Sequence, residues 1–227
     1  MPGKPPLATM GTMTDSPAAP DASATPARAR RAYHHGGLAE ALVAAARAEI
    51  ERVGPASLSL SECCRSAGVS TAAPYKHFRG KDDLLRHVIM AGFGDLGAAL
   101  TAARDARPGP PAPRIAAMGR AYVRFALEQP GLFHLMFGKT AEHHAADEAE
   151  MEAAGLACFG VLIEEVAGGI GERADGDAAR GLSVMLWTFV HGAASLALEG
   201  AYEAAHVEPD VDGMIEAATR RLLPDLA

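Results

Sequence analysis

The chain has 227 residues and a net charge of −7, and hydrophobic residues make up 49% of it. This length suits one large or two small domains with a substantial core, and the negative charge argues against a uniformly basic nucleic-acid binder. No uninterrupted apolar run approaches the roughly 18 residues of a membrane-spanning helix, and the start of the chain lacks the hydrophobic stretch of a signal peptide. Three cysteines are too few for a disulfide framework. We therefore expect a cytoplasmic protein with no membrane partner.

The charge is divided unevenly along the chain. From Arg28 to His87 there are ten Lys and Arg against six Asp and Glu, which gives +4. From Val88 to Ala227 there are ten against twenty, which gives −10. This asymmetry predicts one module for an anionic partner and a second module with another task.

The first part of the chain changes character near Tyr33. Residues 1–32 are rich in Pro, Ala, Ser and Thr, which predicts a disordered tail, and Met10 and Met13 leave the natural start open. From Tyr33 onward the apolar spacing is helical and strand patterns are missing, so we expect an all-α fold. The first helix is predicted over residues 37–53, and "SLSE" at 59–62 has the spacing of a capping box that opens a short helix through Ser66.

The stretch "GVSTAAPYKHFRGKDDLL" at residues 68–85 predicts a helix-turn-helix. Gly68 ends the short helix, Ser70 caps a third helix over Thr71–Phe78, and Lys81 begins a longer one towards Leu100. The third helix would be about 12 Å long, close to the width of the DNA major groove. Residues able to bind phosphates gather there, namely Ser70, Thr71, Tyr75, Lys76, His77 and Lys81. Ala72 and Ala73 keep one face thin, and Pro74 stiffens the first turn.

Residues 33–85, above all "AGVSTAAPYKHFRGKDDLL", resemble the DNA-binding domain of TetR-type bacterial transcription regulators. The resemblance implies a helix-turn-helix domain over residues 33–83 that binds a double-stranded DNA operator. It places Thr71, Ala72 and Pro74 on the base-facing side, and Ser70, Tyr75, His77 and Lys81 at phosphate-contacting positions. The chain departs from the family at Ala72 and Ala73, where a glycine and then a hydroxyl residue are common.

The second part, residues 84–227, reads as a loop at 106–113 followed by five more helices. "QPGLFHLMFG" (129–138) is a short apolar helix, residues 180–203 form a long helix that is apolar on two sides, and the last helix covers Val211–Leu223. The short apolar segment, together with Trp187, His191 and Gly192, resembles a subset of TetR-type regulators with a Trp–His–Gly signature. This resemblance implies a helical ligand-binding and dimerisation domain, a homodimer joined through a four-helix bundle, and an unknown small-molecule inducer. Gly192 serves either local packing or the subunit contact.

Six residues are candidates for the wall of a ligand site, namely Met118, Tyr122, Phe125, Phe133, Trp187 and His191. The alternative is that the Met and Phe side chains are ordinary core and that His191 is a hydrogen-bonded core histidine.

Two other clusters invite a chemical reading. His143, His144, Asp147 and Glu148 suggest a metal site, but adjacent helical histidines diverge by about 100°, so we expect a solvated loop and no metal. The adjacent Cys63 and Cys64 are either small hydrophobic residues or, with a pKa lowered by Arg65, redox sensors. No nucleophile–base pair, phosphate loop or zinc-protease motif is present, so neither an enzyme nor a cofactor is expected.

The predicted function is a ligand-responsive DNA-binding regulator, a repressor that acts as a homodimer on a palindromic operator, associated with the nucleoid in the cytoplasm. An activator would need the same parts. The first alternative is a dimeric helical small-molecule-binding protein with a vestigial helix-turn-helix, and a helical enzyme comes after it.

Overall fold

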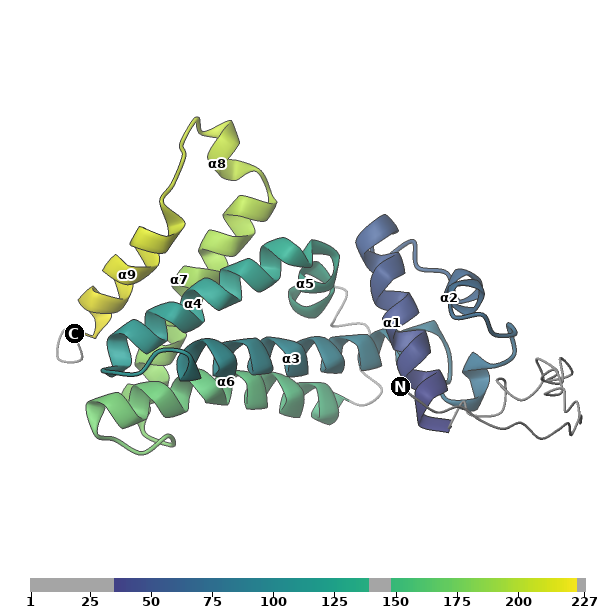
Figure 1. Ribbon diagram of the computed structural model, residues 1–227, viewed down its shortest axis with the longest axis horizontal. Coiled ribbons are helices and arrows are strands. Elements are labelled where there is room, and N and C mark those ends of the chain that lie inside the picture. The colour runs from purple at the N-terminus through teal and green to yellow at the C-terminus, as the bar shows by residue number, and fades with distance from the viewer. Residues whose placement is uncertain (1–34, 139–147, 224–227) are drawn as a thin grey trace, which may run out of the picture. The chain divides into compact units, whose positions relative to one another are not determined.

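The computed structural model describes residues 35–138 and 148–223, and these form helices joined by turns and loops (Figure 1). The predicted tail, Met10, Met13, His143, His144 and Asp147 lie outside the described residues. The helices are α1 (His35–Val53), α2 (Leu60–Ser66), the 3-10 helix η2 (Pro74–Lys76), α3 (Lys81–Asp105), α4 (Pro111–Glu128), α5 (Pro130–Phe137), α6 (Glu148–Ile170), α7 (Asp177–Leu198), α8 (Ala201–Ala204) and α9 (Val211–Leu222). The prediction of an all-α fold is confirmed.

The predicted α-helix over Thr71–Phe78 is wrong. Only Pro74–Lys76 is helical, as one 3-10 turn whose N-cap residue is Ala73 and not Ser70. The ring of Pro74 has no N–H to continue a helix from Thr71, so proline takes the first helical position. The N–H of Ala73 bonds to the carbonyl of Ser70 at 3.0 Å, which makes the preceding residues a turn.

The capping box predicted at the start of α2 does not form. Ser59 is the N-cap residue, but its side chain makes no capping hydrogen bond. Glu62 pairs instead with Arg65, one turn further along the same helix. The Glu62 carboxylate thus makes its contacts towards the end of the helix, where Arg65 donates to it.

The long helix predicted over residues 180–203 is also divided. α7 ends at Leu198, and Gly200 has a left-handed φ of +65° before α8 begins. Glycine adopts this conformation without the steric penalty that a Cβ would bring. In addition, α3 runs on to Asp105 and α4 begins at Pro111, so the loop predicted at 106–113 is shorter.

Packing is organised around α3, which lies between α4 and α6 (Figure 1). Near its N-terminus, Leu84, Leu85 and Ile89 are buried in the same cluster as Leu42 of α1. Further along, Leu96 and Leu100 are buried in that cluster too, together with Met118 of α4. One apolar core therefore extends from α1 and α2 to α7 and α9. The predicted domain division at residues 83 and 84 falls inside α3 and stays a prediction.

α1 is joined to the N-terminus of α5 by direct contacts. The carboxylate of Glu51 accepts hydrogen bonds from the backbone N–H groups of Gly131 at 3.0 Å and Leu132 at 2.8 Å. These N–H groups would otherwise lack a partner within the helix, and the carboxylate also complements the helix dipole. A Cβ at Gly131 would lie 2.8 Å from the carbonyl oxygen of Ile50, so the two backbones approach more closely than any side chain allows.

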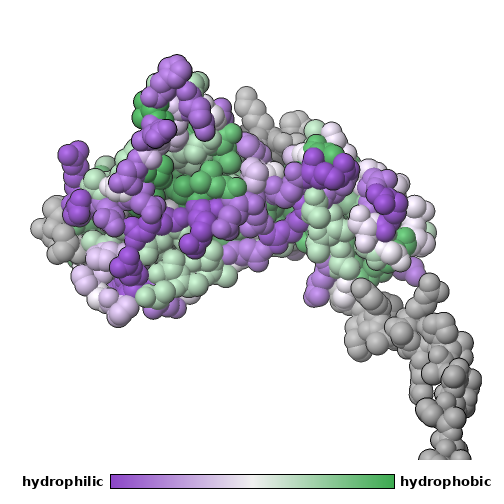
Figure 2. All heavy atoms as spheres, turned by 45° about the horizontal axis from the view of Figure 1, so that its top comes forward, coloured by the Kyte–Doolittle hydropathy of each residue, from purple (hydrophilic) through white to green (hydrophobic). Residues whose placement is uncertain are grey.

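α6 and α7 present apolar surface that the described residues do not cover. By length and composition alone, residues 149–170 and 177–198 could cross a membrane, with mean hydropathies of 1.6 and 1.5, and only 28% of each window is buried. The outer side of α7 exposes Val184, Met185 and Leu196. Figure 2 shows hydrophobic surface beside the projection formed by α8 and the end of α7. The helix predicted to be buried on two sides is thus covered on one side by its own chain.

Gly131→Ala should destabilise the fold by about 1 to 3 kcal/mol, because a methyl group would force α5 away from the Ile50 carbonyl. Gly168→Ala is the control, since no atom lies within 4 Å of a Cβ there and alanine favours an exposed helical position. Urea unfolding of both variants measures the difference. If Gly131→Ala were as stable as the wild type or more stable, the close approach of α5 to the Ile50 carbonyl would be contradicted.

Candidate functional site

The segment between α2 and η2 forms an exposed, polar turn. α2 closes with the N–H of Val69 bonded to the carbonyl of Cys64 at 2.9 Å, and Gly68 has a φ of +67°. Beyond it, Ser70, Thr71 and Ala72 are exposed. Hydroxyl groups and thin alanine surface are thus presented to solvent along one short stretch, as a contact with DNA would require.

The candidate DNA-contacting residues of η2 differ in exposure. Tyr75 is 65% exposed, Lys76 is exposed and His77 is half-buried. No hydrogen bond to the Tyr75 hydroxyl is found among the described residues. Pro74, which the resemblance places on the base-facing side, is buried. The turn is anchored from below by Phe78, which is 3% exposed and meets His87 edge-on at 5.0 Å.

Lys81 begins α3 beside this surface. Its Nζ donates to the backbone carbonyl of Ala56 at 2.9 Å, so the ammonium group ties α3 to the loop before α2. Lysine carries three donors, so the other two can still meet a phosphate. The N-terminus of α3 adds backbone N–H groups and its dipole at the same place.

Cys63 and Cys64 lie beneath the turn and are buried. Burial raises the pKa of the Cys63 thiol to about 11, and the negative charge of Glu49 adds to the effect. Burial also raises the pKa of Cys64. Arg65 points to Glu62 and does not stabilise a thiolate. The two cysteines therefore behave as small hydrophobic residues, and the redox interpretation loses its physical basis.

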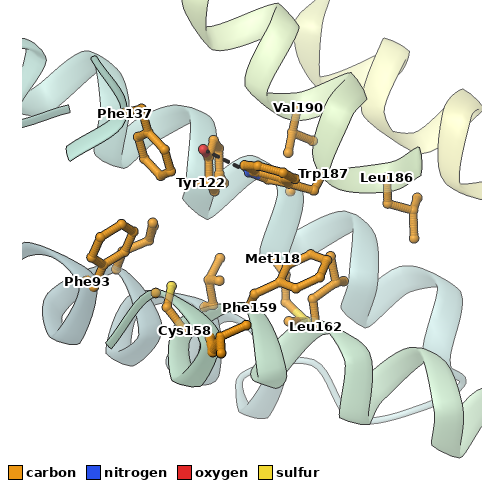
Figure 3. A pocket seen from close by; sticks show the side chains of 15 residues that line it. Phe93, Met118, Tyr122, Phe137, Cys158, Phe159, Leu162, Leu186, Trp187 and Val190 are labelled. Carbon is orange, nitrogen blue, oxygen red and sulfur yellow. Dashed lines mark hydrogen bonds between the residues drawn. The ribbon is translucent and has the colours of Figure 1, made fainter. Parts of the chain in front are cut away.

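A cavity of about 340 Å³ lies among α3, α4, α5, α6 and α7 (Figure 3). Its wall is almost wholly apolar and consists of Phe93, Leu96, Leu100, Met118, Gly119, Tyr122, Phe137, Gly155, Leu156, Cys158, Phe159, Leu162, Leu186, Trp187 and Val190. The volume falls in the range of small-molecule pockets, about 300 to 1,000 Å³. Cys158 is buried in this wall, and burial raises its pKa to about 11.

One hydrogen-bonded cluster supplies the polar groups of this wall. The indole Nε1 of Trp187 donates to the hydroxyl of Tyr122 at 3.2 Å, drawn as the dashed line in Figure 3. The same hydroxyl lies 2.8 Å from Nδ1 of His191. Trp187 and His191 are one turn apart on α7, so both reach one residue of α4. This geometry explains why the tryptophan and histidine occur four residues apart.

The protonation states follow from burial. Burial raises the pKa of Tyr122 and lowers the pKa of His191. Both shifts favour the uncharged form, so both side chains are neutral at neutral pH. The Tyr122 hydroxyl accepts from Trp187 and can donate its own proton to Nδ1 of His191. In that arrangement the histidine carries its proton on Nε2.

Three of the six candidate ligand residues line the cavity: Met118, Tyr122 and Trp187. His191 reaches it only through the hydroxyl of Tyr122. Phe133 packs against His191 with ring centres 5.3 Å apart, and Phe125 is 5% exposed within the core. Neither phenylalanine is part of the wall.

Sequence reasoning missed the contribution of α3 to the cavity. Phe93, Leu96 and Leu100 follow one another at intervals of three and four residues, which places them on one side of the helix. That pattern was available, but it equally fits ordinary core packing. Among residues 37–138 and 149–223, no three His, Cys, Asp or Glu side chains gather as a metal site would require.

Known proteins resemble both parts of the chain. Residues 42–88 match the family model "Bacterial regulatory proteins, tetR family", and residues 115–222 match "Tetracyclin repressor-like, C-terminal domain". No curated protein matches the chain.

Solved structures share the fold. A protein with unknown function from Rhodococcus sp. RHA1 is 35% identical, with 87% of this chain and 99% of that chain covered and a TM-score of 0.71. A TetR family transcription regulator from Marinobacter aquaeolei VT8 is 19% identical, with coverages of 84% and 95% and a TM-score of 0.60. The transcriptional regulator FadR from Bacillus subtilis, in complex with stearoyl-CoA, is 14% identical, with coverages of 83% and 99% and a TM-score of 0.62.

The lowered pKa of His191 predicts a loss of stability in mild acid. Between the folded pKa and the ordinary value of about 6.5, the unfolded chain binds more protons, so stability falls as the pH drops below about 6.5. His191→Asn should reduce this fall, whereas His206→Asn, which removes an exposed histidine, should follow the wild type. Urea midpoints between pH 7.5 and pH 5.5 test it. If the urea midpoints of wild type and His191→Asn fell in parallel as the pH was lowered, His191 would not be the cause of the acid sensitivity.

Proposed function

Because this chain belongs to the TetR family of bacterial transcription regulators, we propose that it is a ligand-responsive repressor that binds a palindromic operator as a homodimer. Members of this family are DNA-binding transcription factors and not enzymes. The resemblance of the helix-turn-helix segment to the family is confirmed, while the Trp–His–Gly subset stays a prediction. The proposal includes a place in the cytoplasm, at the nucleoid.

The observation that carries the proposal is that α3 takes part in both candidate sites. Lys81 stands at its N-terminus beside the exposed turn, and Phe93 lies in the cavity wall. Twelve residues of helix separate them, which is about 18 Å at 1.5 Å per residue. A continuous helix transmits a displacement of one end to the other.

The mechanism follows from unequal affinity for two states. The two recognition elements of a dimer must be about 34 Å apart to enter successive major grooves. A ligand that binds better to a state with another spacing shifts the population towards it, and the operator is released. FadR, which shares the fold, is described with stearoyl-CoA bound, and this supports a small molecule as the ligand of this chain.

The exposed side of α7 supports the homodimer. Around Gly192, no atom of the chain lies within 4 Å of a Cβ, so this glycine serves no packing contact within the described residues. The exposed Met185 and Leu196 lie on the same helix, and Met214 is exposed on α9. We place α7 and α9 of two copies in a four-helix bundle, with Gly192 at the contact.

A binding experiment tests the proposed function. Sequences that the purified protein retains from a random DNA pool define the operator, and retardation titrations then measure its affinity at several salt concentrations. With about four phosphates neutralised by each subunit, log K should fall against log salt with a slope of about −7 for the dimer. A flat response would favour the alternative, a dimeric small-molecule-binding protein with a vestigial helix-turn-helix.

Variants of two exposed residues separate positioning from base reading. Tyr75→Phe should weaken binding to operator and scrambled DNA by similar factors, because a phosphate contact carries no base information. Thr71→Ala should reduce the difference in binding free energy between operator and scrambled DNA by about 1 kcal/mol or more. Tyr202→Phe, on α8, is the matched control and should change neither affinity. If the Tyr75 variant affected base discrimination and the Thr71 variant did not, the assignment of Thr71 to the bases and Tyr75 to a phosphate would be wrong.

Gly192→Leu should weaken self-association and, with it, operator binding, while the fold of each subunit is kept. Overpacking of a helix contact costs about 1 to 3 kcal/mol. Gly168→Leu on α6 is the control, because a Cβ there also has no atom of the described residues within 4 Å. Sedimentation without detergent measures the dimer. A folded Gly192→Leu protein that stays dimeric at nanomolar concentration would remove Gly192 from the interface.

A further inference from the structure

None of the described residues that line the cavity has a charged side chain. Its lining residues are aliphatic and aromatic side chains, two glycines, two sulfur-containing residues and the Tyr122 hydroxyl. An ionised group needs a countercharge or several hydrogen bonds when it leaves water. Away from the side where the exposed Leu156 lines the cavity, the wall formed by the described residues supplies neither to a carboxylate, a phosphate or an ammonium group.

The polar atoms that do face the cavity satisfy one another. The Trp187 indole donates to Tyr122, and Tyr122 is bonded to His191. When Tyr122 accepts from Trp187 and donates to His191, its oxygen keeps one lone pair, so a ligand can add a single donor there without breaking the cluster. A ligand with several polar groups would leave most of them unpaired.

The size of the cavity sets the size of the ligand. An apolar cavity of about 150 Å³ holds one benzene molecule, so about 340 Å³ offers room for two to three aromatic rings. Four aromatic side chains, Phe93, Phe137, Phe159 and Trp187, project towards this space (Figure 3). Flat ring systems can stack on these faces or meet their edges.

We propose that this cavity binds an uncharged, largely aromatic molecule of two to three rings, with at most one hydrogen-bond donor, directed at the Tyr122 hydroxyl. The inference rests on the proposed function, because it identifies the chemical class of the inducer. It also assigns selectivity to the wall, which rejects the ionised form of a molecule whose neutral form it accepts.

Two dyes with one ring skeleton test the charge rule in the full-length protein. N-phenyl-1-naphthylamine is neutral and carries one N–H donor, and 1-anilinonaphthalene-8-sulfonate adds a sulfonate to the same rings. Trp187 is the only tryptophan of the chain, so energy transfer from it to the dye reports binding near α7. We expect the neutral dye to bind about 100-fold or more tightly than the sulfonate.

A pair of variants locates the bound dye. Gly155 lies in the wall, and a Cβ there would stand 3.7 Å from the ring of Phe93, which is ordinary van der Waals contact. We therefore expect Gly155→Leu to fold and to reduce the space in the cavity. This variant should reduce the affinity for the neutral dye about tenfold or more. Gly168→Leu places the same side chain on the same helix away from the cavity and should not change the affinity. Circular dichroism checks that both variants are folded.

The outcomes separate the ligand class from the proposed function. Equal affinity for both dyes, no binding of the neutral dye, or binding unaffected by Gly155→Leu would each overturn the ligand class. Retardation of operator DNA with and without saturating neutral dye is measured separately. Operator binding that is absent altogether contradicts the regulator function, even where the neutral dye binds as expected and the ligand class stands.

Discussion

The continuity of α3 is the constraint on which the rest of the structure depends. Its first turns are packed into the core beneath the exposed turn through Leu84 and Leu85, and its later turns supply Phe93 and Leu96 to the cavity. A helix buried along its length by α1, α4 and α6 cannot bend freely at its middle. The tight contact of α5 with α1 at Gly131 is a second connection between the helices that support the exposed turn and those that form the cavity. The cavity wall and the exposed turn are therefore mechanically joined twice.

The Tyr122 cluster solves the problem of polar groups in an apolar site. A buried phenol, indole and imidazole are each costly when they lack a partner, and here three groups share two hydrogen bonds. The bonds also fix α4 against α7, since Tyr122 comes from one helix and Trp187 and His191 from the other. The neutral state of His191, which burial favours, is the state in which Nδ1 can accept from Tyr122. Architecture and protonation thus depend on one another.

Much of the fold could be predicted from apolar periodicity, because helical spacing is a local property. The C-terminal end of α1 and the position of α9 followed from it. The errors arose at single residues. The third helix is shorter than predicted because Pro74 has no N–H. The predicted capping box is missing, and Glu62 pairs with Arg65 instead. The site was harder, because a wall residue and a core residue look alike in sequence. Met118 and Phe125 share one face of α4, yet Met118 lines the cavity and Phe125 does not.

α7 shows why an apolar sequence pattern needs a structure to interpret it. Its hydropathy alone is compatible with a membrane span, and its two apolar sides have different surroundings. Leu186 and Trp187 face the cavity, whereas Met185 and Leu196 face outward. In the proposed dimer, a single helix thickness would therefore separate the ligand from the partner subunit. A ligand that displaces Trp187 would act on the subunit contact through the same rigid element that it touches, and the spacing of the two DNA-binding surfaces would depend on that contact.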